Sequence, residues 1–137
     1  MATYPLSESY ADGQVLTAAN VNSITEGVND IAFGIFNAQT GTTYTLVLTD
    51  VAKVISLSNA SSITLSVPTN ASVAFPIGTQ ILLYQAGAGQ VTVSAVTPGT
   101  TSIRTQGSKT KLFGQYAVAG LLKVATDEWV LYGNLTA

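Results

Sequence analysis

The sequence predicts a mainly β fold: an N-terminal extended arm and a short helix, followed by an antiparallel β-sandwich or jelly-roll-like domain. Apolar and polar residues alternate with a period of two from about residue 42 onward, as they do in half-buried strands. Turn-forming clusters of Pro, Gly, Asn and Ser separate these segments at intervals of about ten residues. Before them, residues 17–36 have apolar positions at helical spacing.

The first two segments are expected to precede the β domain. Residues 1–16 show no periodicity and contain Pro5 and Gly13, which predicts an extended arm. Thr17 is a suitable N-cap for a helix over residues 17–36. Within this helix, apolar residues separated alternately by three and four positions form a heptad seam, which consists of Val21, Ile24, Val28, Ile31 and Ile35.

The seam residues also bear on the oligomeric state. All five are β-branched, and β-branched residues at both seam positions favour three helices over two in a parallel bundle. The sequence therefore indicates a homotrimer joined along the seam. An ordinary amphipathic helix that packs against the β domain of its own chain fits the same residues.

The all-β domain is expected to span residues 37–137. Many short strands and the lack of any βαβ pattern are typical of sandwiches and jelly rolls. The alternation predicts strands at residues 43–49, 52–57, 62–67, 79–86, 90–96, 101–105, 110–113, 115–125 and 129–135.

The composition excludes several functions. The 137 residues include no Cys and no His, which removes zinc sites built on these residues, thiol nucleophiles and Ser-His-Asp triads. Only 9% of the residues are charged and the net charge is -2, so nothing attracts a nucleic acid. The apolar runs are far shorter than the ~20 residues that span a bilayer, and the N-terminus does not resemble a signal peptide. We therefore expect no enzyme activity, metal, cofactor, nucleic acid or membrane partner.

Three residue groups invite comparison with known kinds of site. Asp127 and Glu128 are adjacent carboxylates, and turn formation explains them as well as acid–base chemistry does. Residues 107–110 (GSKT) lack the glycine that a phosphate-binding loop places directly before its lysine, so a hairpin turn is expected. Four aromatic residues fit either core packing or a sugar-stacking platform, namely Tyr84, Tyr116, Trp129 and Tyr132.

Two parts of the chain resemble proteins of tailed-bacteriophage particles. Residues 12–30 (DGQVLTAANVNSITEGVND) are similar to the N-terminal attachment segments of head and tail appendage proteins. Residues 37–95, together with 121–131 and 133–135, resemble a β-knob module that recurs in phage fibres and head-decoration proteins. The two resemblances together cover nearly the whole chain.

The resemblance implies a trimeric structural protein on the exterior of the phage particle, made in the cytoplasm of the bacterial host. Its N-terminal region would bind the major capsid protein or another virion protein through an arm that contains Tyr4, Pro5, Leu6 and Tyr10. Because no long shaft precedes the knob, a capsid decoration or head-fibre protein is expected. The alternative is a tail fibre, tip or collar protein whose knob binds a cell-surface glycan.

Overall fold

The computed structural model describes residues 35–137, which form a β domain. Within this range the strands and two short 3-10 helices follow in the order β1 (Phe36–Gln39), β2 (Thr43–Thr45), η1 (Leu48–Asp50), β3 (Val54–Leu57), β4 (Ile63–Val67), β5 (Gln80–Gln85), β6 (Val91–Ala95), β7 (Ser102–Thr105), η2 (Gln106–Ser108), β8 (Lys111–Leu112), β9 (Val118–Ala125), β10 (Glu128–Gly133) and β11 (Leu135–Thr136). The prediction of a mainly β domain is confirmed for these residues.

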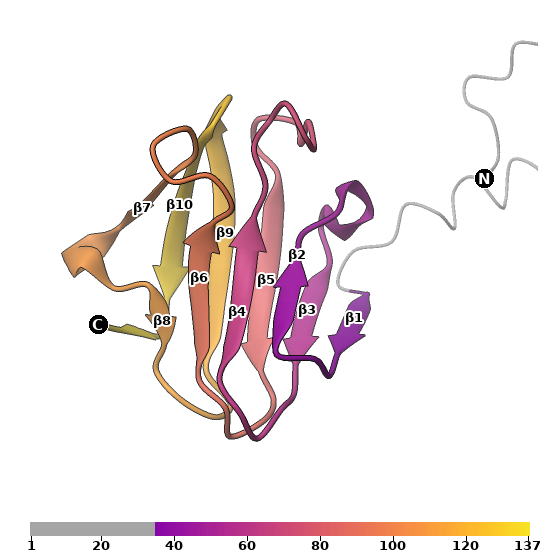
Figure 1. The fold of residues 1–137 in the computed structure, drawn as a ribbon, viewed down its shortest axis with the longest axis vertical. Helices are drawn as coiled ribbons and strands as arrows, with labels where there is room; N and C mark the ends of the chain where they lie inside the picture. Colours follow the sequence, from indigo (N-terminus) through magenta and orange to yellow (C-terminus); the bar gives the residue numbers. More distant parts are fainter. Residues whose placement is uncertain (1–34) are drawn as a thin grey trace, which may run out of the picture. The chain divides into compact units, whose positions relative to one another are not determined.

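The strands form two mixed sheets. The six-stranded sheet has the order β1-β3-β5-β9-β10-β7, and the five-stranded sheet has the order β11-β8-β6-β4-β2. From β1 to β9 each strand lies in the other sheet from the strand before it (Figure 1). The chain thus completes a full coil before it returns to a sheet, and neighbours such as β3 and β5 or β4 and β6 are parallel.

The predicted antiparallel arrangement is therefore wrong for the first half of the domain, and a jelly roll is not confirmed. Antiparallel pairing begins at β8, which pairs with β6 and β11, and continues where β9 joins β5 and β10. Residue alternation could not reveal this difference, because a strand buries the same face whether its neighbour is parallel or antiparallel.

The core lies between the inner faces of the two sheets. Leu46 and Trp129 are among its fully buried residues, and the edge of the Phe75 ring meets the Trp129 ring at 5.4 Å between centroids. The buried hydrophobic residues are Leu46, Ile55, Leu57, Ile63, Leu65, Val67, Phe75, Ile81, Leu83, Val91, Val93, Leu112, Ala117, Ala119, Leu121, Trp129 and Leu131. Along β3 to β6 they occupy alternate positions, as the sequence predicts.

The predicted strands agree with the structure in their central residues, and the differences lie at the ends. The sequence does not predict β1, since its first residue falls at the end of the predicted helix. Residues 48 and 49, expected to end a strand, belong to η1 instead. Tyr116 has a φ of 71°, so the strand expected from residue 115 starts only at Val118.

One residue of the predicted helical seam lies within the described part of the chain. Ile35 is not helical; its carbonyl oxygen accepts a hydrogen bond from the backbone N–H of Val54 at 2.9 Å, and β1 follows directly. The helix expected over residues 17–36 therefore cannot include residues 35–36, and Ile35 is not a seam residue. The other seam residues (Val21, Ile24, Val28, Ile31) and the arm residues (Tyr4, Pro5, Leu6, Tyr10) lie outside the described residues.

Candidate interaction surface

The outer face of the six-stranded sheet is unusually apolar. The strand register aligns Phe36 of β1 with Val54 of β3, and Val54 in turn with Leu82 of β5. The same row continues through Gly120 of β9 to Tyr132 of β10. A single row of side chains thus crosses five strands without a charged or hydrophilic residue other than the tyrosine hydroxyl.

Neighbouring rows extend this apolar face. Tyr84 is opposite Val118, and Leu122 is opposite Val130. These two rows also include the polar residues Ser56 and Gln80. Phe36 is 61% exposed and its ring contacts that of Tyr84 edge-on, with 6.5 Å between centroids. We call this surface the apolar sheet face, and it consists of Phe36, Val54, Leu82, Tyr84, Val118, Gly120, Leu122, Val124, Val130 and Tyr132.

Gly120 shapes the centre of the apolar sheet face. A Cβ atom at this position would lie within 2.7 Å of two ring carbons and the hydroxyl oxygen of Tyr132. The hydroxyl end of the Tyr132 side chain therefore lies over the glycine, and the residue stays 43% exposed. A larger residue at Gly120 would therefore displace the Tyr132 side chain from this position.

Charge is confined to one margin of this face. At the β7 edge, Arg104 Nε donates to Glu128 Oε1 at 2.5 Å, so that the two charges offset each other. The pair is exposed and contributes at most about 1 kcal/mol to stability. Because the pair carries no net charge, it does not oppose the approach of a second apolar surface to the apolar sheet face.

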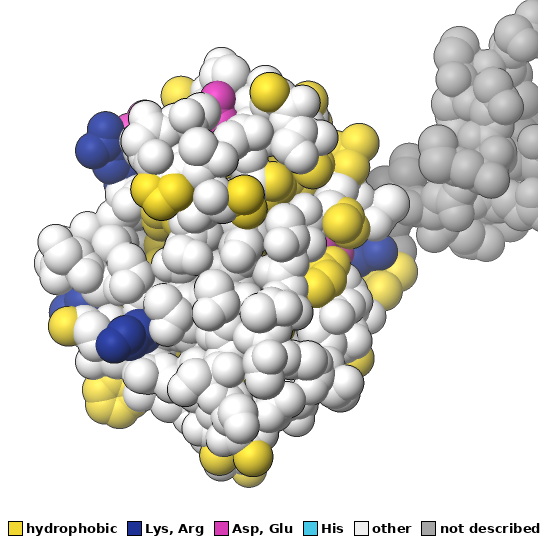
Figure 2. Space-filling view, viewed as in Figure 1, with side chains coloured by type: hydrophobic (Ala, Val, Ile, Leu, Met, Phe, Trp, Pro, Cys, Tyr) yellow, Lys and Arg dark blue, Asp and Glu magenta, His cyan; other side chains and the backbone are white. Residues whose placement is uncertain are grey.

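The outer face of the five-stranded sheet has a different character. Its parallel strands align Thr43 with Thr64 and Thr64 with Thr92, and the next outward row contains Thr45, Ser66 and Ser94. Figure 2 shows that the surface over β2, β4 and β6 is mainly white, with neither hydrophobic nor charged side chains. Hydroxyl groups thus cover one side of the domain, while apolar groups cover the other.

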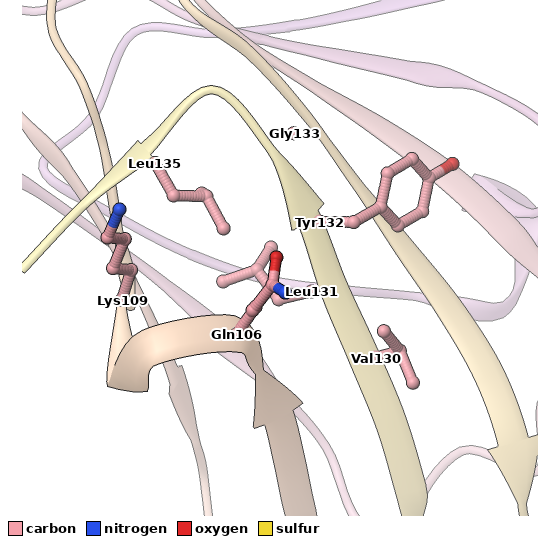
Figure 3. Close-up of a pocket in the computed structure, with 7 residues that line it drawn as sticks. All are labelled: Gln106, Lys109, Val130, Leu131, Tyr132, Gly133 and Leu135. Carbon is pink, nitrogen blue, oxygen red and sulfur yellow. The ribbon is translucent and has the colours of Figure 1, made fainter.

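A small pocket lies beside the apolar sheet face. It has a volume of about 330 Å³ and is lined by Gln106, Lys109, Val130, Leu131, Tyr132, Gly133 and Leu135. Figure 3 shows Gln106, Lys109, Leu131 and Leu135 on one side of β10, while Val130 and Tyr132 point to the other side. Lys109 and Gln106 can donate hydrogen bonds to a ligand oxygen, and none of the lining residues carries a carboxylate.

A buried carboxylate stabilises the β1–β3 end of the domain. Asp50 is fully buried; Oδ2 accepts hydrogen bonds from the Tyr44 hydroxyl at 2.7 Å and the Val47 N–H at 2.9 Å, and Oδ1 accepts one from Asn37 Nδ2 at 2.8 Å. Burial, together with Asp50, raises the pKa of Tyr44 to about 12. These bonds satisfy the carboxylate, which indicates a structural role.

The structure separates the residues that the sequence grouped as candidate sites. Asp127 Oδ1 accepts hydrogen bonds from the Asn70 N–H at 2.7 Å and from Thr101 Oγ1 at 3.3 Å, whereas Glu128 pairs with Arg104. The two carboxylates therefore do not act as a pair. Residues 106–108 form η2 between β7 and β8, which belong to different sheets, so the expected hairpin turn at residues 107–110 is wrong.

The aromatic residues do not form a single platform. Trp129 is buried in the core, while Tyr84 and Tyr132 lie on the apolar sheet face and Tyr116 is exposed in the connection before β9. Asp50 and Lys123 are not among the candidate residues that the sequence indicates, although both are buried. The sequence does indicate the burial of Lys123. This residue follows Leu121 by two positions in an apolar strand, so that both side chains point to the same inward face.

Neither a metal cluster nor a membrane-spanning helix occurs in residues 35–137. This range contains no group of three or more His, Cys, Asp or Glu side chains that could hold a metal ion. No helix in it is long and apolar enough to cross a membrane. No protein-family model matches the chain, and neither does any curated protein.

Proposed function

We propose that the chain is a trimeric structural protein on the exterior of a tailed-phage particle, as a capsid decoration or head-fibre protein attached by its N-terminal region. The resemblance of residues 12–30 and 37–95 to phage appendage proteins suggests the particle. The apolar sheet face supports assembly with further copies of the same chain. The role is structural and uses no cofactor.

The dimensions of the apolar sheet face favour burial. The face extends over five strands, whose four spacings of about 4.8 Å give a width of about 19 Å, and strands of about six residues give a length of about 20 Å. The resulting area of a few hundred Å² is as large as the biggest apolar patches on typical monomers, which often mark interaction sites. Burial of side chains such as Phe36 and Leu82 would supply the hydrophobic stabilisation.

Further copies of this chain are the partners that best fit the apolar sheet face. The ion pair at its margin, Arg104 with Glu128, is internally neutral, so identical faces can approach each other without electrostatic repulsion. In a trimer these faces would surround the threefold axis and leave the hydroxyl-covered faces in solvent. Three N-terminal arms would then bind the particle together, with a gain of about 10²–10⁴ over one arm.

Electron cryo-microscopy of the intact phage particle tests this proposal. We expect trimers on the capsid surface, with the apolar sheet faces turned toward the threefold axis. Absence of the protein from the particle would refute the proposal. Location at the tail tip or collar would instead support the second candidate.

The second candidate is a tail fibre, tip or collar protein that binds a host glycan. The pocket beside Tyr132 favours it, because Lys109 and Gln106 can donate hydrogen bonds to sugar hydroxyl or carboxylate oxygens next to apolar side chains. A glycan array with the purified full-length chain measures this activity. Binding that is lost in Lys109→Ala but retained in Lys53→Ala would support this candidate.

A further inference from the structure

Lys123 is a buried amine in contact with a side-chain amide. It lies on β9 and is only 2% exposed. Its Nζ donates hydrogen bonds to Asn70 Oδ1 at 2.6 Å and to the Phe75 carbonyl oxygen at 2.7 Å. The Trp129 ring centroid lies 5.9 Å from Nζ, so that aromatic side chains separate the amine from solvent.

We propose that Lys123 and Asn70 react to form an intramolecular isopeptide bond. The lone pair of the neutral Lys123 amine attacks Cγ of Asn70, and a new Nζ–Cγ bond forms. The Cγ–Nδ2 bond then breaks with its electron pair, and a proton lost from Nζ is transferred to Nδ2. One molecule of ammonia leaves, and the reaction needs no oxidant or other reactant.

The geometry places the reacting groups in contact before any reaction. Because a carbonyl carbon lies about 1.2 Å from its oxygen, the bond from Nζ to Oδ1 also brings Nζ close to Cγ. Because folding already holds the two groups together, the reaction loses little further translational and rotational entropy. This favours an amide exchange that is otherwise slow. After the reaction, the remaining Nζ hydrogen can still donate to the Phe75 oxygen.

The surroundings favour the nucleophilic form of the amine. Burial lowers the pKa of Lys123, although the charge of Asp127 partly offsets this effect. A lower pKa increases the fraction of neutral amine, which is the form that attacks a carbonyl.

Asp127 is the acidic residue best placed to assist the proton transfer. Its Oδ1 accepts the backbone N–H of Asn70 at 2.7 Å, which fixes the carboxylate beside the residue that is attacked. Its charge acts on Lys123 without a direct ion pair between the two described residues. We assign it the role of accepting the proton from Nζ and returning it to the departing Nδ2.

The product would connect two distant parts of the chain. Asn70 belongs to the connection between β4 and β5, whereas Lys123 lies in β9, 53 residues further along the sequence. A cross-link over this separation restricts the unfolded chain and resists separation of the β4–β5 connection from the sheet. This inference concerns the chemistry of a single chain and does not depend on the proposed function.

Mass spectrometry of the purified full-length chain tests the inference. We expect an intact mass lower than the sequence mass by one ammonia, and a protease digest that contains a branched peptide joining Asn70 to Lys123. An unmodified intact mass after prolonged incubation of the folded protein would overturn the proposal. It would show that Lys123 only ties the β4–β5 connection to β9 through hydrogen bonds.

Variants separate this reaction from cyclisation of Asn70 with its own backbone, which also releases ammonia. Lys123→Met and Asp127→Asn should retain the full sequence mass, while the surface control Lys109→Met should still lose ammonia. Loss of ammonia in Lys123→Met would overturn the cross-link. If Lys123→Met does not fold, the presence or absence of the branched peptide in the unaltered chain still decides.

Discussion

At the scale of single residues, buried polar groups connect segments that are far apart in sequence. Asp50 accepts hydrogen bonds from Asn37, Tyr44 and the N–H of Val47, and these bonds attach β1 and β2 to η1. Hydrogen bonds to a buried charge contribute about 1.5–3 kcal/mol each, and more when their loss leaves the charge unpaired. Such a group stabilises the domain only while every partner keeps the right protonation state.

The Tyr44 hydroxyl makes stability depend on alkaline pH. Its pKa is about 12 in the folded chain, against 10.0 for an ordinary tyrosine, so the unfolded chain releases this proton first as pH rises. The stabilisation is fully present below pH 10 and is lost progressively between pH 10 and 12. Urea titrations at several pH values should therefore show a fall in unfolding free energy across this window.

Tyr44→Phe is the matched variant for this measurement. It should lower the unfolding free energy at neutral pH by about 1–3 kcal/mol, because Asp50 loses one donor. Its decline between pH 10 and 12 should be shallower than that of the unaltered chain. Equal slopes in the two proteins would contradict the assigned role of Tyr44.

At the scale of elements, stacked turns hold the parallel strands in register. The connection between β3 and β4 contains Asn59. Its Nδ2 donates a hydrogen bond at 2.8 Å to the carbonyl oxygen of Thr40, which lies in the connection between β1 and β2. On the other side, Gly89 N–H donates to the Asn59 carbonyl oxygen at 2.8 Å. The β1–β2, β3–β4 and β5–β6 connections thus lie against one another at one end of the domain.

Gly89→Ala should disrupt this stack. A Cβ atom at Gly89 would lie 1.8 Å from the Ser61 carbonyl oxygen, so the backbone of one turn must move. We expect a loss of about 3 kcal/mol in unfolding free energy, measured by chemical denaturation. Gly41→Ala is the control, because its Cβ would make only ordinary contacts and should change stability by less than about 1 kcal/mol. Equal effects of the two substitutions would argue against the stack.

At the scale of the whole molecule, the two outer faces differ in chemistry. One sheet presents the apolar sheet face, and the other presents rows of threonine and serine. This difference agrees with a composition that is 47% hydrophobic and only 9% charged, because apolar side chains cover one outer face and uncharged hydroxyl groups cover the other.

Leu82→Glu tests whether the apolar sheet face is buried between copies. The substitution places a charge at the centre of the face, and burying it would weaken the trimer at least about tenfold, or about 1.4 kcal/mol. Light scattering over a range of protein concentrations measures the change. Thr64→Glu, on the hydroxyl-covered face, should leave assembly unaltered. An unaffected trimer in Leu82→Glu would place the subunit contact elsewhere, and Ile24→Asp would then test the predicted helical seam.

The β class of residues 37–137, the central residues of most strands and their buried faces follow from the sequence alone, because alternation and turn residues are local signals. The inward position of Lys123 is also contained in the sequence, although a lysine in a core was not anticipated. The parallel pairing of β1 to β6, the apolar sheet face and the contact of Lys123 with Asn70 emerge only in the folded domain. These features depend on which segments meet across long sequence separations, and a residue pattern along one strand carries no information about its neighbours.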